Sequence, residues 1–189
     1  KRVIILKKNL IICCSPISDS CSNNIKNRLS EILTGRNEAV EIRDLYAIGF
    51  NPVITEDDIF SASQGKFMED VKKEQEYIKN ADNIILIFPI YSSSMPALMK
   101  GYIDRVFSQN FAYSYNSDGS INKLMTGKTI STFSPMGASL EYYEKSGIKS
   151  AMDSVFSGTF LFRGFEVRGI HYLGSDNREK MLSDIENLV

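Results

Sequence analysis

The chain of 189 residues has no tryptophan, one histidine and three cysteines. A single histidine, His171, argues against a histidine-rich metal centre, and no CxxC spacing accompanies the cysteines. An odd number of cysteines in a chain of this size argues against a disulfide scaffold and favours a reducing compartment. We therefore expect a cytoplasmic protein without a metal site, in which Cys13 and Cys14 are buried structural thiols on opposite faces of a strand.

An excess of charge of either sign is also missing. The 22 basic and 23 acidic side chains leave a net charge of −1, which favours neither nucleic acid nor an anionic membrane as a partner. The longest apolar runs are well short of a bilayer span, and Lys7 and Lys8 interrupt the first one too early for a signal peptide. We expect no membrane insertion and no nucleic-acid binding, and we treat residues 1–189 as one domain.

Motifs for side-chain catalysis are missing as well. No Ser-His-Asp set and no pair of catalytic carboxylates can be placed, so we assign no catalytic residue. We expect His171 to be structural, because it falls near the end of a predicted strand. Lys100 and Asp104 are four residues apart on a predicted helix and are expected to form a surface pair worth about 0.3 kcal/mol.

Apolar strand-like runs alternate with amphipathic helical segments along the chain. Strands are predicted at residues 10–14, 40–45, 84–88, 129–134 and 165–172. Helices are predicted after residue 24, at 67–80, after Pro96 and at the end, where Asp176 and Glu179 form a plausible capping box, and residues 140–162 are expected to be mainly helical. Residues 46–59 are expected to be a surface loop. An earlier apolar run at residues 3–6 need not be a strand, and the sequence does not decide whether it is an extension of the fold. The pattern predicts an α/β fold with a doubly wound parallel sheet of order 2-1-3-4-5.

The most informative stretch runs from residue 84 to residue 115. Its apolar strand is ended by Pro89, and Pro96 opens an amphipathic helix after a short polar loop. Asp118 and Gly119 then signal a tight turn. The loop lies at the carboxyl end of a central strand, where ligands of open α/β sheets bind.

A second polar loop, SPISDSCSNN at residues 15–24, follows the first predicted strand. Small hydroxyl and amide residues at a helix start can hold an anion such as a phosphate, with help from the free N–H groups and the helix dipole. Simple capping by Ser22 or Asn23 is the alternative. The predicted sheet order brings this loop and the loop after residue 88 to the same crevice.

The strings FPIY, MPALMKGYIDRVF and FAYSY, in this order, resemble the NAD(P)H:quinone oxidoreductase branch of the flavodoxin-like flavoproteins. This resemblance implies a flavodoxin-like fold, a bound FMN or alternatively FAD, NAD(P)H as co-substrate, and a site at a homodimer interface. It also implies positions for the ligands. The expected cofactor-binding residues are Ser15, Ser20, Ser22, Asn23, Asn24, Pro89, Ile90, Tyr91, Ser92, Ser93, Thr132, Phe133, Ser134 and Gly137. The expected substrate pocket consists of Tyr113, Tyr115, Met136 and Tyr142.

The sequence departs from the family pattern in two places. The family's T-T-G-G loop is reduced here to one threonine and one glycine, and its tyrosine–histidine pair falls near Ser139 and Lys145. We therefore expect main-chain N–H groups of residues 90–93 to stabilise the reduced flavin. Lys145 could supply positive charge, although a solvated lysine is at least as good an interpretation.

These observations favour an enzyme that passes hydride from NAD(P)H through a flavin to a quinone or similar planar acceptor. Two alternatives stay open. One is a flavin-binding regulatory subunit of a potassium-efflux system, as some relatives are. The other is a flavodoxin-type electron carrier, which the weak net charge disfavours.

Overall fold

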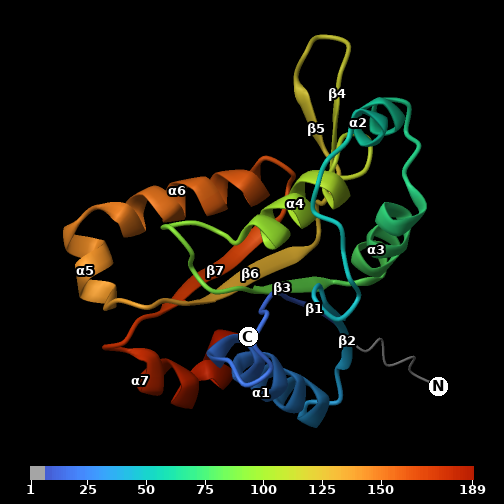
Figure 1. The fold of residues 1–189 in the computed structure, drawn as a ribbon. Helices are drawn as coiled ribbons and strands as arrows, with labels where there is room; N and C mark the ends of the chain where they lie inside the picture. The colour runs from blue at the N-terminus through green and yellow to red at the C-terminus, as the bar shows by residue number, and fades with distance from the viewer. Residues whose placement is uncertain (1–6) are drawn as a thin grey trace.

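The computed structural model describes residues 7–189, so the apolar run at residues 3–6 lies outside the described part. A five-stranded parallel sheet of order β2-β1-β3-β6-β7 forms the centre of the molecule (Figure 1). Its strands are β1 (Lys8–Cys13), β2 (Ala39–Asp44), β3 (Asn83–Ile87), β6 (Thr129–Pro135) and β7 (Glu166–Leu173). This order confirms the doubly wound topology that the sequence predicts.

Helices cover both faces of the sheet. They are α1 (Cys21–Gly35), α2 (Glu56–Ser63), α3 (Glu69–Asn80), α4 (Ala97–Val106), α5 (Leu140–Lys145), α6 (Ile148–Leu161) and α7 (Arg178–Ser183), followed by the 3₁₀ turn η1 (Ile185–Leu188). The α1, α7 and η1 segments lie on one face, and α3, α4 and α6 lie on the other. None of the helices in residues 7–189 is long and apolar enough to cross a bilayer.

Each face of the sheet has its own apolar core, because side chains alternate along every strand. On β1, Ile11 and Cys13 point into the core under α1, whereas Leu10 and Ile12 point into the core under α4 and α6. Cys14 lies in the core under α4 and α6, together with Leu10 and Ile12. The prediction that the adjacent cysteines face opposite sides is therefore confirmed.

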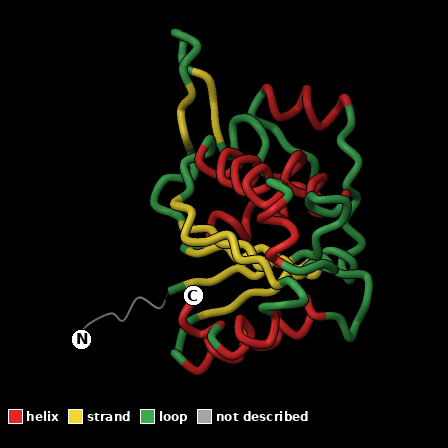
Figure 2. Tube along the Cα trace, turned by 90° about the vertical axis from the view of Figure 1, so that its left-hand side faces the viewer, coloured by secondary structure: helices red, strands yellow, loops and turns green. Residues whose placement is uncertain are grey.

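A short antiparallel hairpin stands away from this body (Figures 1 and 2). It consists of β4 (Tyr113–Tyr115) and β5 (Ile121–Lys123), paired antiparallel. Gly119 has a positive φ of 82°, a conformation that glycine adopts at little cost. The tight turn predicted from Asp118 and Gly119 is thus present.

Residues 46–59 are less loop-like than the sequence predicts. Helix α2 begins at Glu56, capped by a reciprocal box between Thr55 and Asp58. Arg105 of α4 donates to Asp58 of α2 at 2.9 Å and to Asp70 of α3 at 2.7 Å, and all three groups lie where α2, α3 and α4 meet. A buried arginine shared by two carboxylates fixes α2 in place, a long-range effect that local sequence does not reveal.

One prediction in the last third of the chain is confirmed and one is wrong. Residues 140–162 are mainly helical as expected, and Gly147, with a positive φ of 76°, divides them into α5 and α6. The Asp176–Glu179 capping box does not form, since α7 begins at Arg178 after Asn177. The Asp176 carboxylate instead accepts the main-chain N–H groups of Leu140 and Glu141, at 2.7 and 3.2 Å, and so caps α5.

Candidate functional site

The carboxyl ends of β1 and β3 are adjacent, with Cys13 paired to Ile87. The chain leaves β1 towards α1 on one face of the sheet and leaves β3 towards α4 on the other. A crevice at such a point is the usual ligand site of an open α/β sheet. The two polar loops that the sequence singles out therefore meet here, as expected.

The loop after β1 presents a run of unused main-chain donors. Apart from the turn at residues 18–19, the N–H groups from residue 17 to residue 22 form no hydrogen bond among the described residues. The loop is held from within, because the Ser15 and Ser20 hydroxyls lie 2.8 Å apart and the Asn23 amide donates to the Ile17 carbonyl at 2.8 Å. Successive free N–H groups at a helix N-terminus form a cradle for an anion, which fits a phosphate.

Helix α1 is capped by Ser20, not by Ser22 or Asn23 as the sequence suggested. The Ser20 hydroxyl accepts the Asn23 N–H at 3.2 Å. The Asn23 side chain is buried and also faces the Cys13 thiol, so its role in the described chain is to shape the loop. Ser22 is buried and Asn24 is exposed. Capping and anion binding are compatible here, because they use different N–H groups.

The loop after β3 forms a tight two-residue turn. Tyr91 and Ser94 exchange two main-chain hydrogen bonds of 3.0 Å, and the residues between them have positive φ values of 49° for Ser92 and 59° for Ser93. These are the features of a type I′ turn, which normally carries asparagine and glycine. Serine in this conformation costs about 1–2 kcal/mol per residue, and such strain is often found at functional sites.

The turn narrows the set of donors expected from residues 90–93. The Ile90 N–H donates to the Pro135 carbonyl at 2.8 Å, and the Tyr91 N–H is used within the turn. Among the described residues, the N–H groups of Ser92 and Ser93 have no acceptor, and both residues are exposed. The Ile90 side chain is buried in the core, Tyr91 is half exposed and Pro89 is partly buried.

The third expected loop begins later than the sequence suggests. Thr132, Phe133 and Ser134 lie inside β6 and are fully buried, because β6 pairs with β7 as far as Pro135. Their placement in a ligand loop is therefore wrong. Met136 is also buried, at 2% exposure, whereas Gly137 is exposed in the loop that follows.

Arg178 is a residue of this region that sequence reasoning missed. Its guanidinium donates to the Met136 carbonyl at 2.7 Å, and its Nε atom is buried with no partner among the described residues. Burial raises the pKa of the Cys21 thiol, and the nearby Arg178 charge partly offsets this rise. Arg178 thus places positive charge close to the start of α1. Arg178 is the first residue of α7, where the helix dipole disfavours a cation, and this unusual position could have indicated a role for its charge.

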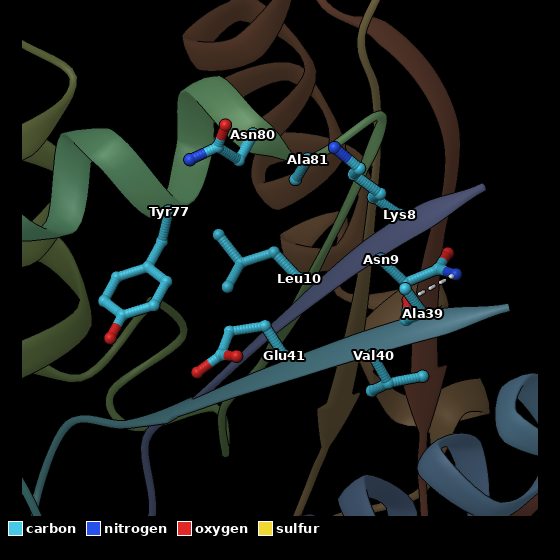
Figure 3. Close-up of a pocket in the computed structure, with 9 residues that line it drawn as sticks. All are labelled: Lys8, Asn9, Leu10, Ala39, Val40, Glu41, Tyr77, Asn80 and Ala81. Atoms are coloured by element: carbon cyan, nitrogen blue, oxygen red, sulfur yellow. Dashed lines mark hydrogen bonds between the residues drawn. The ribbon is translucent and has the colours of Figure 1, made fainter. Parts of the chain in front are cut away.

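A cavity of about 300 Å³ lies at the opposite edge of the sheet (Figure 3). Leu10 and Ala81 are part of its apolar floor, and the charged side chains of Lys8 and Glu41 reach its rim. It borders the amino ends of β1 and β2 and the end of α3, so it shares no residue with the two loops of the crevice.

Comparison with known proteins agrees with this geometry. Residues 7–188 match the family model described as "Flavodoxin-like fold". The chain belongs to the flavodoxin-like fold family. It is 33% identical over 182 residues to an uncharacterized NAD(P)H oxidoreductase of Haemophilus influenzae, covering 92% of this chain and 90% of the relative. It is 30% identical to the human ribosyldihydronicotinamide dehydrogenase (quinone), covering 85% and 78%.

A solved structure extends this agreement to three dimensions. The NAD(P)H:quinone oxidoreductase of Methanothermobacter marburgensis superimposes on this flavodoxin-like protein with a TM-score of 0.86. The two chains are 26% identical, and 96% of each is covered. The family resemblance that the FPIY, MPA-helix and FAYSY strings indicate is thereby confirmed.

Tyr113 and Tyr115 do not lie at the crevice of their own chain. The hairpin that carries them follows the end of α4, whereas the Ser92–Ser93 turn precedes its start, as Figure 1 shows. Tyr113 packs instead on Tyr115 and on Phe162, with ring centroids 5.8 and 4.8 Å apart. A substrate pocket that includes these tyrosines therefore needs a second copy of the chain, as the expected site at a homodimer interface implies, and it stays a prediction. Tyr142 is exposed on α5, next to the loop after β6.

The remaining candidate side chains have structural surroundings. His171 stacks on Phe133 at 4.7 Å, and burial lowers its pKa, as suits a structural histidine. Lys145 is exposed and pairs with Glu141 on the outer surface of α5. Lys100 and Asp104 form the expected surface pair at 2.7 Å. In residues 7–189 no cluster of three or more histidine, cysteine or acidic side chains is arranged to hold a metal ion.

Proposed function

We propose that the chain is a flavin-dependent NAD(P)H oxidoreductase that binds FMN and reduces a quinone or similar planar acceptor. The observation that carries this proposal is the pairing of two sets of free donors at one crevice. The first is the N–H cradle of residues 17–22, and the second is the N–H pair of Ser92 and Ser93. The first fits a phosphate and the second fits the polar edge of a ring.

The residues present fit a flavin phosphate without a lysine or arginine inside the loop. The free N–H groups of this loop and the dipole of α1 favour a dianion, and Arg178 adds a full positive charge nearby. We choose FMN over FAD because the loop after β1 offers one set of N–H donors, which fits the single phosphate of FMN. When bound, the flavin would carry two electrons from the nicotinamide to the acceptor.

The Ser92–Ser93 turn would act as a fixed pair of donors for negative charge at the ring edge. Its N–H groups are held in place by the two Tyr91–Ser94 hydrogen bonds, so little reorganisation is needed when charge develops. This role needs no side-chain acid. It is consistent with the partly buried His171, whose pKa is lowered by desolvation, and with the exposed position of Lys145.

We further propose that two copies form a homodimer in which the hairpin of one copy covers the crevice of the other. Tyr115 is 56% exposed at the outside of the hairpin. Large apolar side chains are also exposed on α2 and in the segment before it, namely Val53, Ile54, Ile59 and Phe60. Several exposed large apolar side chains within eight residues are consistent with an interface between chains. In this arrangement the Tyr113, Tyr115 and Phe162 cluster lines the acceptor side of the partner's site.

The test begins with flavin binding. The protein is titrated with FMN, FAD and riboflavin, and the phosphate cradle predicts that FMN binds at least tenfold more tightly than riboflavin. Arg178→Gln should weaken FMN binding and leave riboflavin binding unchanged. Arg168→Gln, an exposed arginine on β7, is the matched control. If neither FMN nor FAD binds at micromolar concentration, the proposal is refuted.

Turnover distinguishes the enzyme from its alternatives. Initial rates with NADH or NADPH and several acceptor concentrations should give parallel double-reciprocal lines, because donor and acceptor would use the same site in turn. Tight flavin binding without turnover would favour a regulatory role. We also propose that the chain is a single functional domain. We propose a cytoplasmic location as well, because its three cysteines are free thiols, as is usual in a reducing compartment.

A further inference from the structure

The loops that follow β6 and β7 lie side by side at the carboxyl end of the sheet (Figure 1). The first loop is residues 136–139, which precede α5, and the second is residues 174–177, which precede α7. The first loop adjoins the proposed flavin site, because the Ile90 N–H of the loop after β3 donates to the Pro135 carbonyl just before it. The position of the first loop therefore depends on what holds it on its other side.

Hydrogen bonds tie the start and the middle of the first loop to the second. At its start, the Met136 N–H donates to the Leu173 carbonyl at 2.9 Å, and the Met136 carbonyl accepts from Arg178. In its middle, the Ala138 carbonyl accepts the Ser175 N–H at 3.2 Å. The far end of the loop, where α5 begins, is held by a side chain instead.

That side chain is the carboxylate of Asp176. Its Oδ1 atom accepts the Leu140 N–H at 2.7 Å, and its Oδ2 atom accepts the Glu141 N–H at 3.2 Å. These bonds lower the pKa of Asp176, the Leu140 bond most of all, so the carboxylate is charged at neutral pH. Hydrogen bonds to a charged acceptor are about twice as strong as those between neutral groups. Removal of the carboxylate would therefore free the first loop at the end that leads into α5.

Gly174 shows how closely the two loops approach at this contact. A Cβ atom at residue 174 would lie 2.5 Å from the Leu140 nitrogen and 2.7 Å from the Asp176 Oδ1, the two atoms of the shorter hydrogen bond. Real Cβ atoms do not come so close, so a side chain here would push the two loops apart. Gly174 does not have a positive φ, and glycine is therefore needed for the close approach and not for its backbone conformation.

Between its tied ends the first loop presents free main-chain donors. The N–H groups of Gly137, Ala138 and Ser139 have no acceptor among residues 7–189. They are donors of the same kind as those of the Ser92–Ser93 turn. Donors that are already fixed in place stabilise developing negative charge well, because they need little reorganisation.

We propose that Asp176, with Gly174 beside it, is a positioning residue that fixes the loop after β6 against the flavin ring. The proposal rests on the proposed function, and Asp176 itself does not touch the flavin. Asp176 and Arg178 then have different roles although they are two residues apart. Arg178 acts on the phosphate, whereas Asp176 acts on the ring through the loop.

A rival explanation is that Asp176 only stabilises α5. Ser139 separates the two explanations, because its hydroxyl also caps α5, where it accepts the Tyr142 N–H at 3.2 Å. This hydroxyl makes no hydrogen bond to residues 174–177. Ser139→Ala is therefore the matched control, since it removes a cap of the same helix and leaves the tie between the loops intact.

The experiment measures the affinity of the whole chain for FMN and for riboflavin. Asp176→Ala should weaken the binding of both at least tenfold and leave their ratio unchanged, whereas Arg178→Gln should weaken FMN alone. Gly174→Ala should act in the same direction as Asp176→Ala. Ser139→Ala should stay within twofold of the unmodified protein. Asp176→Asn keeps an oxygen that can accept the Leu140 N–H, so it should recover most of the affinity.

The midpoint potential of bound FMN is a property that stabilisation of α5 alone would not change. Because the loop donors favour the anionic, reduced flavin, Asp176→Ala should lose at least tenfold more affinity for reduced than for oxidised FMN. This difference lowers the two-electron potential by about 30 mV. In the flavin-free protein, hydrogen exchange of residues 136–145 should become faster in Asp176→Ala, and exchange of residues 15–24 should not change.

Three results would overturn the proposal. The first is unchanged affinity for both flavins in Asp176→Ala and Gly174→Ala. The second is an equal loss in Ser139→Ala and Asp176→Ala, which would reduce Asp176 to a helix cap. The third is a loss confined to FMN, which would place Asp176 at the phosphate. If Asp176→Ala does not fold, Gly174→Ala and Asp176→Asn decide by the same criteria. Failure of the unmodified protein to bind any flavin would instead refute the proposed function, and it is detected before any variant is compared.

Discussion

Gly101 gives the sharpest test of how the segment before α2 packs on α4. It lies in the middle of α4, where alanine would normally be better than glycine by about 1 kcal/mol. The structure predicts the opposite sign. A Cβ atom at this position would lie 2.2 Å from the Pro52 carbonyl oxygen and 2.5 Å from the Pro52 Cβ, closer than real Cβ contacts come.

The magnitude follows from these two opposing effects. Overpacking against the Pro52 backbone costs up to about 3 kcal/mol, because Pro52 and α4 must move apart. Subtracting the ~1 kcal/mol gained in helix propensity leaves Gly101→Ala about 2 kcal/mol less stable than the unmodified protein. The loss should be seen as a lower urea midpoint at unchanged slope. Flavin affinity should be retained in the folded variant, since the N–H cradle is formed by other residues.

Gly158→Ala is the matched control for this measurement. Gly158 lies in α6, is exposed, and has no atom within 4 Å of the position its Cβ would take. This variant should therefore be stabilised by up to about 1 kcal/mol. If Gly101→Ala were stabilised as much as Gly158→Ala, the close packing of Pro52 on α4 would be refuted.

Three further predictions follow from named groups. Burial raises the pKa of the Asp58 carboxyl, but the hydrogen bonds that it accepts from Arg105 and Thr55 lower this pKa by more. The ionised carboxylate therefore stabilises the fold above about pH 4, and this stabilisation is lost as the pH falls through the lowered pKa. Asp58→Asn should flatten this acid dependence in urea unfolding and cost about 3–5 kcal/mol at neutral pH. Partial burial lowers the pKa of His171, so the native state loses stability as the pH falls below about 6.5. His171→Phe should remove that dependence, and flavin reduction by NADH in stopped flow should be unchanged; a large slowing would show that the imidazole takes part. Tyr115→Ala should raise the KM for the acceptor and leave FMN bound, and an unchanged KM would exclude the hairpin from the acceptor site.

The sequence by itself determined the sheet order, the family and the two loops that meet at the crevice. These features are encoded locally. Pro89 ends a strand, Pro96 begins a helix, and the spacing of apolar residues in each segment identifies it as a strand or a helix. Right-handed crossovers then leave few ways to arrange five such β-α units. The ligand loops follow, because the carboxyl ends of parallel strands lie at one edge.

Only the tertiary structure decided which atoms are free to bind. The Ile90 N–H is used by the Pro135 carbonyl from another strand, and this long-range bond leaves Ser92 and Ser93 as the donors. Asp176 caps a helix more than thirty residues away in the sequence, and Arg178 reaches the loop after β6 in the same way. Such contacts depend on pairing between distant segments, and the periodicity of a single segment carries no information about them.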